Sequence, residues 1–316
     1  MYSGDSMTTA PSMADLGTQR HPDPANAAQG RARYFNSANA FNVKLPPVCP
    51  VVFLDPMQNA MSTGSPTGFF ACDQSDALDC PHPATTPLML ARYARINAGE
   101  SLTASFKASG SMWHVISGAG KVAQGDTQIE WAAGDTFYLP GAMTTVLQAG
   151  SRSAVLWVVT DEPLCAHTGM CPSTSAQQAA VHFPAGVVAD QIARIHQTEP
   201  DADTSGMAVV FSCEELEIHR NLMPTLTLSF NTLSPRSSQR PHRHNSAALT
   251  LVLSGDDCHS TIDGTDHAWT RWTTLVTPPG AAHSHHNAGD ARADFLIAQD
   301  GALYYYARTM GFSFLE

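Results

Sequence analysis

Three histidines of this 316-residue chain have the spacing of a metal site built on β-strands. His242 and His244 are separated by one residue, so in an extended segment both imidazoles project to one side while Arg243 projects to the other. A third ligand must come from a neighbouring strand, where His283 follows after a hairpin-length excursion. Neutral imidazoles suit iron, nickel, copper or zinc. The alternative is that all three lie in polar surface turns, because a His-x-His motif is weak by itself.

The segments around these histidines follow an all-β pattern that occurs twice. Short apolar runs punctuated by glycine extend from Leu88 onward, as in antiparallel β-folds. Gly125–Gly141 aligns with Gly264–Gly280 without a gap, and both segments end in Pro-Gly. Two copies of one β-unit, with the three histidines in the second copy, explain this self-similarity.

Three stretches of the second copy carry a family resemblance. They are the HRHNSAAL that begins at His242, the VLSG that ends at Gly255, and the TPPGAAHSHHNAG of Thr277–Gly289. Together they resemble the metal-binding cupin of gentisate and salicylate 1,2-dioxygenases, which reads approximately HRHxxxALRFxxEG followed by TPPWxWHDHxNEG. The resemblance implies an all-β bicupin, in which two double-stranded β-helix (jelly-roll) barrels follow one another in tandem.

The resemblance also assigns roles to histidines of the second copy. Carried over to the matching positions, the family's iron ligands fall on His242, His244 and His283. The second histidine of the family's HDH falls on His285, which we expect to act as a catalytic group by donating a hydrogen bond or a proton near bound dioxygen. His285 could instead face solvent in a loop. The implied cofactor is iron(II), one per chain, in the C-terminal barrel.

Departures from the family bear on the substrate. Thr250 occupies the position of the arginine in ALRF, and Ile297 occupies that of an acidic residue. The two family tryptophans before the third ligand are Gly280 and Ala282 here. These changes remove a cationic partner for a carboxylate and enlarge the pocket, so we expect Thr250 to contact a substrate bulkier than gentisate or differently substituted. Trp269, on the preceding hairpin, either rebuilds a wall of the substrate pocket or packs in the core.

The first copy lacks a comparable set of ligands. The residues that align with the His-x-His motif are Ser105 and Lys107, and Thr144 aligns with the third histidine. A hydroxyl, an ammonium and a second hydroxyl do not replace three imidazoles. We therefore predict that the N-terminal barrel binds no metal.

The chain is predicted to have four parts. Residues 1–40 are rich in small and polar residues without periodicity, which is typical of a mobile arm. Residues 41–165 form an N-terminal cupin with an irregular leading segment, and residues 221–316 form the C-terminal, metal-binding cupin. Residues 166–220 connect the two barrels, with a short helix expected at Val187–His196.

Composition excludes several classes of function. A net charge of −11, with three lysines in the chain, argues against a nucleic-acid or anionic-membrane surface. No stretch approaches the roughly 20 apolar residues of a membrane span, and the N-terminus lacks the pattern of a secretory signal. We expect a cytoplasmic protein with reduced cysteines and, by the resemblance, a homo-oligomer.

Three hypotheses for the function follow. The first is a non-haem iron(II) dioxygenase that uses dioxygen to cleave the ring of a hydroxylated aromatic acid similar to gentisate or salicylate, in the catabolism of aromatic compounds. The second is a cupin lyase or isomerase that uses the metal as a Lewis acid, and the third is a non-catalytic cupin that binds a small ligand. The three histidines, without a glutamate after the His-x-His motif, and the family-like flanks favour the first.

Overall fold

The computed structural model describes residues 12–41, 43–170, 173, 178–200, 204 and 206–315. The chain divides into two compact units, Met1–Pro46 and Pro47–Glu316. The first unit contains the short helices η1 (Met13–Asp15) and α1 (Ala27–Arg31), and none of its described residues is buried. This part of the chain therefore builds no apolar core of its own. Its mobility remains a prediction.

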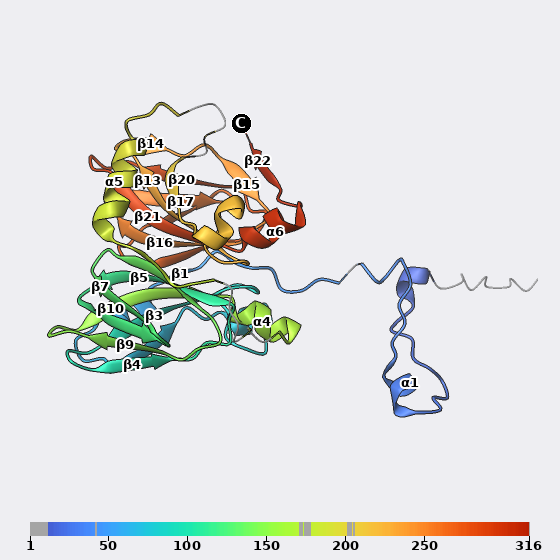
Figure 1. Cartoon of the computed structure of the whole chain (residues 1–316). Coiled ribbons are helices and arrows are strands. Elements are labelled where there is room, and N and C mark those ends of the chain that lie inside the picture. Colours follow the sequence, from blue (N-terminus) through green and yellow to red (C-terminus); the bar gives the residue numbers. More distant parts are fainter. Residues whose placement is uncertain are drawn as a thin grey trace, which may run out of the picture. The chain divides into compact units, whose positions relative to one another are not determined.

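The second unit contains two barrels, each made of two antiparallel sheets (Figure 1). The first barrel, cyan to green in Figure 1, has a six-stranded and a four-stranded sheet. The six strands, in spatial order, are β11 (Val181–Phe183), β8 (Thr136–Pro140), β5 (Gly110–Ser117), β10 (Ala154–Thr160), β3 (Leu90–Ile96) and β2 (Gly68–Ala71). The four strands are β4 (Ser101–Ala104), β9 (Thr145–Ala149), β6 (Ala119–Gln124) and β7 (Thr127–Ala132).

The second barrel, mainly orange to red in Figure 1, has the same design. One sheet contains β1 (Val52–Phe53), β19 (Thr274–Thr277), β16 (Ala248–Ser254), β21 (Ala293–Gln299), β13 (Thr227–Leu233) and β12 (Met207–Val210). The other contains β18 (Thr265–Ala268), β17 (Cys258–Ile262), β20 (His283–Asn287), β15 (His242–His244) and β22 (Phe312–Phe314), with β14 (Ser237–Ser238) paired to β20. Because β1 comes from the start of the unit, the second barrel includes residues that precede the first barrel in the chain.

Short helices connect and flank the barrels. They are α2 (Asp55–Met61), α3 (Ser75–Leu78), α4 (Glu162–Thr168), α5 (Ala185–Ile195), the 3-10 helix η2 (Glu214–His219) and α6 (Gly301–Ala307). In the longest, α5, Val188 and Ile192 are buried at a spacing of one helical turn, which is how an amphipathic helix packs on a sheet. None of the helices in the described part of the chain has the length and apolar character needed to cross a bilayer.

The two barrels repeat each other in detail, which confirms the predicted bicupin fold. Each copy contains a tight hairpin, β6–β7 in the first and β17–β18 in the second. A short helix follows the last long strand of each copy, α4 after β10 and α6 after β21. Asp161 directly follows β10, and its Oδ1 accepts a hydrogen bond of 2.8 Å from the backbone N–H of Ser109. Asp300 directly follows β21, and its Oδ1 accepts a hydrogen bond of 2.9 Å from the backbone N–H of Ala247. An aspartate at the equivalent position therefore bonds the backbone of the equivalent loop in each copy.

The interiors of the two barrels differ. The first barrel is filled with buried apolar side chains, including Trp113, which stacks on Phe137 at a centroid distance of 5.8 Å. A second apolar cluster lies between the barrels, where Tyr93 and Trp157 of the first meet Leu249 of the second. The apolar clusters inside the second barrel are much smaller. Space and polar groups are therefore concentrated in the interior of the second barrel.

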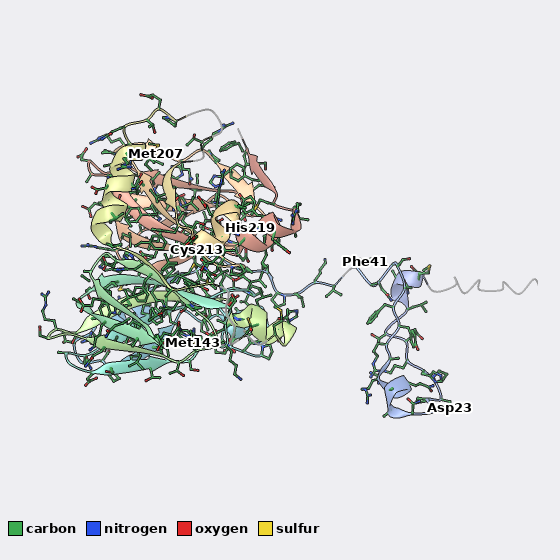
Figure 2. The ribbon with its side chains drawn as sticks, in the orientation of Figure 1. Asp23, Phe41, Met143, Met207, Cys213 and His219 are labelled. Carbon is green, nitrogen blue, oxygen red and sulfur yellow. The ribbon has the colours of Figure 1, made fainter. Side chains whose placement is uncertain are left out.

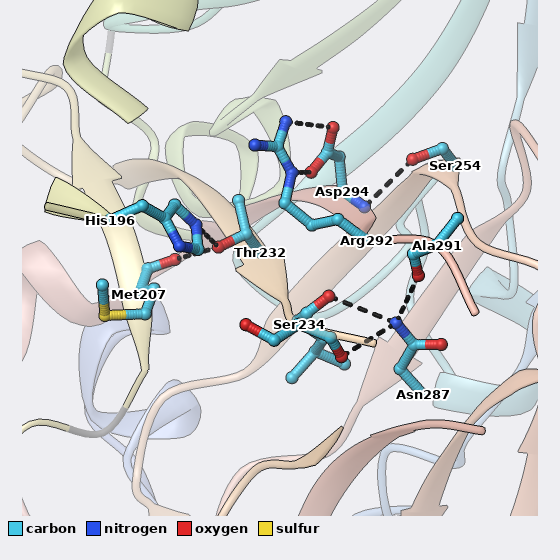
Figure 3. A network of polar contacts seen from close by, with 10 residues as sticks. His196, Met207, Thr232, Ser234, Ser254, Asn287, Ala291, Arg292 and Asp294 are labelled. Atoms are coloured by element: carbon cyan, nitrogen blue, oxygen red, sulfur yellow. Dashed lines mark hydrogen bonds and ion pairs between the residues drawn. The ribbon is translucent and has the colours of Figure 1, made fainter. Parts of the chain in front are cut away.

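Polar contacts hold the strand that carries two of the predicted site histidines. Asn287 ends β20, and its Nδ2 lies 3.1 Å from the carbonyl oxygen of Ser234 and 2.9 Å from that of Ala291 (Figure 3). Its Oδ1 accepts a hydrogen bond of 3.0 Å from the backbone N–H of Gly289. One buried amide thus joins two loops at the end of β20, the β13–β14 loop and the β20–β21 loop. This arrangement fixes the strand on which His283 and His285 lie.

Candidate metal centre

Two neighbouring strands bring the three predicted ligands together. In β15, His242 and His244 are buried and Arg243 is exposed, as the predicted alternation requires. Antiparallel pairing sets His242 of β15 directly opposite His283 of β20. Each of the three imidazoles offers one ring nitrogen, and these three nitrogens lie within 4.8 Å of one another. No other such group of potential ligands is found among the described residues.

A glycine turn delivers the third histidine. The chain turns at Pro279 and Gly280, and β20 begins only at His283. Gly280 has a φ of +77°, a conformation that glycine adopts without strain. Its backbone N–H donates a hydrogen bond of 2.7 Å to the carbonyl oxygen of His244. The turn is therefore attached to one ligand while it positions another.

Backbone carbonyls fix the orientation of all three imidazoles. Nδ1 of His242 lies 2.9 Å, and Nδ1 of His283 3.0 Å, from the carbonyl oxygen two residues earlier in the chain. Nδ1 of His244 lies 2.9 Å from the carbonyl oxygen of Ser246. A carbonyl oxygen only accepts hydrogen bonds, so each Nδ1 carries the proton and each Nε2 carries a lone pair. Three Nε2 atoms are thus available to bind one ion.

The three imidazoles are neutral at physiological pH. Burial lowers the pKa of His242. Burial, followed by repulsion from the neighbouring imidazoles, lowers the pKa of His244 to about 4 and that of His283 to about 3. Only a neutral imidazole can bind a metal, because protonation occupies the lone pair. The site therefore does not have to release protons to bind an ion near pH 7.

His285 lies beside the three histidines but is held differently. It is buried, and its ring centroid is 6.0 Å from that of His283. Its Nδ1 lies 2.8 Å from Oγ of the buried Ser260, and Nε1 of Trp269 donates a hydrogen bond of 2.8 Å to the same Oγ. Nδ1 of His285 is the acceptor found for the hydroxyl proton of Ser260 among the described residues, so the hydroxyl accepts from the indole and donates to Nδ1. This assigns the imidazole proton to Nε2, so His285 is a hydrogen-bond donor toward the cavity.

Burial, and then the neighbouring histidines, lower the pKa of His285 well below its ordinary value. The residue is therefore a neutral donor rather than an imidazolium. It is not the solvent-facing loop residue that the sequence left open as an alternative, because it is only 2% exposed.

A cavity of about 620 Å³ opens beside the four histidines. Its walls combine small and apolar side chains, such as Ala248 and Ile297, with the amides of Asn231, Gln239 and Gln299. The rim is formed largely by the η2 region, α6 and β22. Exposed rim residues are Val210, Ile218, His219 (labelled in Figure 2), Arg220, Tyr305 and Phe312.

The two residues predicted to contact substrate lie outside the lining of this cavity. Thr250 is fully buried in β16, opposite Ile297, and its Oγ1 has no hydrogen-bond partner among the described residues. Trp269 packs against His285 at a centroid distance of 5.8 Å and against Phe295 at 4.9 Å. Thr250 therefore belongs to the barrel interior. Trp269 supports His285 from behind, which fits the core alternative better than the substrate wall.

Sequence reasoning missed two residues of the cavity. Gln299 projects inward because it lies two residues after Ile297 in β21, and its Nε2 lies 3.4 Å from Nε2 of His244. Extending the strand alternation from Ile297 would have identified it. Arg220 lines the cavity from the connection, where its backbone is left-handed with a φ of 55°. No periodic pattern in the sequence indicates a residue of that kind.

Comparison with known proteins agrees with this geometry. Residues 230–298, which include β15, β16 and β20, match the cupin domain family. The second barrel is a cupin domain. This cupin resembles those of gentisate and salicylate dioxygenases, as the sequence motifs indicated. A gentisate 1,2-dioxygenase from Streptomyces sp is 36% identical over 77 residues, which are 24% of this chain and 22% of that protein.

A second enzyme and a solved structure extend the comparison. A 1-hydroxy-2-naphthoate 1,2-dioxygenase from Nocardioides sp. (strain KP7) is 30% identical over 89 residues, 26% of this chain and 23% of that enzyme. The matches thus span less than a quarter of the length of these curated relatives. The salicylate 1,2-dioxygenase structure from Pseudoaminobacter salicylatoxidans superimposes with a TM-score of 0.72 at 12% identity, over 87% of each chain. That similarity establishes a shared bicupin fold for the two-barrel unit.

Proposed function

We propose that this protein is a non-haem iron(II)-dependent dioxygenase that cleaves the ring of a hydroxylated aromatic acid. The observation that carries the proposal is the convergence of three neutral imidazoles, each with Nε2 unprotonated, beside a cavity large enough for an aromatic substrate. The similarity to enzymes named gentisate and 1-hydroxy-2-naphthoate 1,2-dioxygenase supports the type of reaction.

The donor set fits iron(II). His242, His244 and His283 offer three nitrogen ligands without charge, and no thiolate or carboxylate joins them among the described residues. Neutral imidazoles suit iron among the transition metals, and an incomplete set of protein ligands leaves positions for exogenous ones. When bound, the iron supplies the redox chemistry between an electron-rich ring and dioxygen.

The surrounding residues supply orientation and a dry site. The carbonyl contacts to Nδ1 hold each of the three imidazoles in one tautomer and one orientation, so that these rings do not have to move when an ion binds. Ser260 and Trp269 hold His285 with its Nε2–H toward the cavity. A preorganised neutral donor of this kind stabilises negative charge that develops on an oxygen atom during the reaction.

The cavity indicates the kind of acid. Its volume of about 620 Å³ lies well inside the range of about 300–1,000 Å³ that accommodates drug-sized ligands, so it has room for more than one ring. Thr250 does not provide a cation near the histidines, whereas Arg220 provides one at the rim. We therefore propose a substrate larger than gentisate, whose hydroxylated ring lies near the histidines and whose carboxylate lies toward Arg220.

Oxygen consumption tests this function. Protein reconstituted anaerobically with iron(II) is mixed with dioxygen and, in turn, gentisate, salicylate, 1-hydroxy-2-naphthoate and larger hydroxylated aromatic acids. We expect uptake that depends on both iron and substrate, with two atoms of ¹⁸O from labelled dioxygen in the ring-opened product. The His283→Ala variant is the matched control. Turnover of a substrate without oxygen uptake would instead support a lyase or isomerase, and binding without turnover a non-catalytic cupin.

A further inference from the structure

Gln299 brings a carboxamide to the same place as the three histidines. It is the last residue of β21, and its cross-strand neighbour in β16 is Ala248, whose small side chain leaves the cavity open at this level. Nε2 of Gln299 lies 3.4 Å from Nε2 of His244. The amide is thus next to the atom of His244 that a metal ion would use.

The contact between Gln299 and His244 shows which group is bonded to the lone pair on Nε2 of His244. Since Nδ1 of His244 holds its proton against the carbonyl oxygen of Ser246, Nε2 can only accept a hydrogen bond, and the amide N–H donates it. Oε1 of Gln299 is directed instead toward Gly301, where an added Cβ would lie 3.5 Å from it. Without an ion, the amide therefore occupies the lone pair of one ligand.

A half-turn of the amide changes its role. The terminal torsion of a glutamine is broad and roughly two-fold, so Nε2 and Oε1 can exchange places at little cost. Two ligands bound to one ion at about 2.1 Å lie about 3.0–3.4 Å apart in octahedral or tetrahedral geometry. The terminal amide atom that faces His244 is at such a separation already, at 3.4 Å. After the half-turn, that atom is an oxygen with a lone pair.

We propose that Gln299 is the fourth protein ligand of the metal, through Oε1, and that its amide group rotates by a half-turn when the ion binds. The inference rests on the proposed metal centre. It makes the complete set of protein ligands three imidazoles and one neutral oxygen, so the ion keeps its full positive charge. Two strands of one sheet, β15 and β20, then supply the nitrogens, and β21 of the other sheet supplies the oxygen.

Cobalt(II) is a suitable probe, because its visible absorption reports the number and type of its ligands. Metal-free protein is titrated anaerobically with cobalt(II), and affinity and spectrum are compared for the wild type, Gln299→Ala, Gln299→Glu and Asn231→Ala. Asn231 is the matched control, since it places an amide in the same cavity but bonds Oγ of Ser229, at 2.8 Å. We expect Gln299→Ala to weaken binding on the order of 10–100-fold and to shift the spectrum.

The other variants make the outcome decisive. Gln299→Glu should bind cobalt(II) more tightly than the wild type, because a carboxylate adds a negative charge next to the ion, and Asn231→Ala should be unchanged. An unaltered affinity and spectrum in Gln299→Ala, with normal binding by the wild type, would overturn the ligand role alone. Failure of the wild type to bind would overturn the metal centre itself. If Gln299→Ala does not fold, a Gln299→Glu variant that binds no more tightly than the wild type overturns the ligand role.

Discussion

His242 and His283 face each other across the β15–β20 pair, with ring centroids 4.3 Å apart. Cross-strand neighbours have Cβ atoms about 5 Å apart, so two histidines in such a pair can reach one ion without any change in the backbone. His244, two residues along β15, completes the triangle with a centroid distance of 4.7 Å to His283. The strand register alone therefore brings these three side chains together.

Replacing one member of this triangle should remove the metal and leave the barrel folded. His283→Ala is expected to lose bound metal in elemental analysis. Saturating metal should raise the melting temperature of the wild type, by the equivalent of about 2.7 kcal/mol at a hundredfold excess over Kd, and should not raise that of the variant. His286→Ala is the control, because His286 stacks on His259 instead, at a centroid distance of 4.6 Å. Full metal content in His283→Ala would remove this residue from the ligand set.

His285 should matter for turnover and not for metal binding. Its Nδ1 is bonded to Ser260 and its Nε2 donates, so it has no lone pair to offer an ion. We expect His285→Ala to keep its iron and to lower kcat by about 10²–10⁴-fold, the range of positioned acid–base and hydrogen-bonding groups. Single-turnover oxygen kinetics and iron analysis measure the two properties separately. Equal and small effects of His285→Ala and His286→Ala would contradict the donor role.

Trp269→Phe separates the two roles that the sequence left open for this residue. The substitution keeps an aromatic ring against His285 but removes the N–H that bonds Ser260. Since the indole lies behind His285 and outside the cavity lining, we expect a decrease in kcat at nearly constant KM. A rise in KM at constant kcat would instead show that Trp269 forms a wall of the substrate pocket.

The parts of the site that were predicted from sequence are those that follow from strand periodicity. Alternation in a strand determines that His242 and His244 share a face, and the internal repeat indicated the neighbouring strand that carries His283. The depth of the cavity does not follow from alternation. Thr250, which was predicted to contact substrate, is buried in the barrel interior but lies outside the cavity lining. Gln299 reaches His244 only through the β16–β21 register, across 55 positions of sequence.

Arg220 should contribute to the affinity for acidic substrates. It is a cation at the rim of the cavity and is exposed to solvent, so its attraction for a carboxylate is screened by salt. Arg220→Ala is expected to raise KM several-fold with kcat nearly unchanged, and less so at high ionic strength. Arg194→Ala, which removes an exposed arginine of α5, is the control. A change in kcat with constant KM would contradict a binding role for Arg220.

Asp300 should make the stability of the second barrel depend on pH. Burial raises the pKa of this carboxyl to about 7 from 3.8, against the opposing effect of the hydrogen bond from the Ala247 N–H. Between these two values the folded protein holds a proton that the unfolded chain has released. The free energy of unfolding therefore decreases as pH rises from about 4 to 7, and the contribution of Asp300 is constant above that.

Asp300→Asn tests this dependence by keeping an oxygen acceptor for the Ala247 N–H while removing the ionisation. We expect the variant to be more stable than the wild type at pH 8, by an amount on the order of 1–4 kcal/mol, and to show a flatter profile between pH 4 and 7 in urea unfolding. Asp161→Asn provides the contrast in the first barrel. Oδ2 of Asp161 accepts from the hydroxyls of Ser109 and Thr225, so an amide nitrogen at that position should destabilise the fold. A loss of stability in Asp300→Asn at pH 8 would mean that the carboxylate charge stabilises the loop, which would contradict a raised pKa for Asp300.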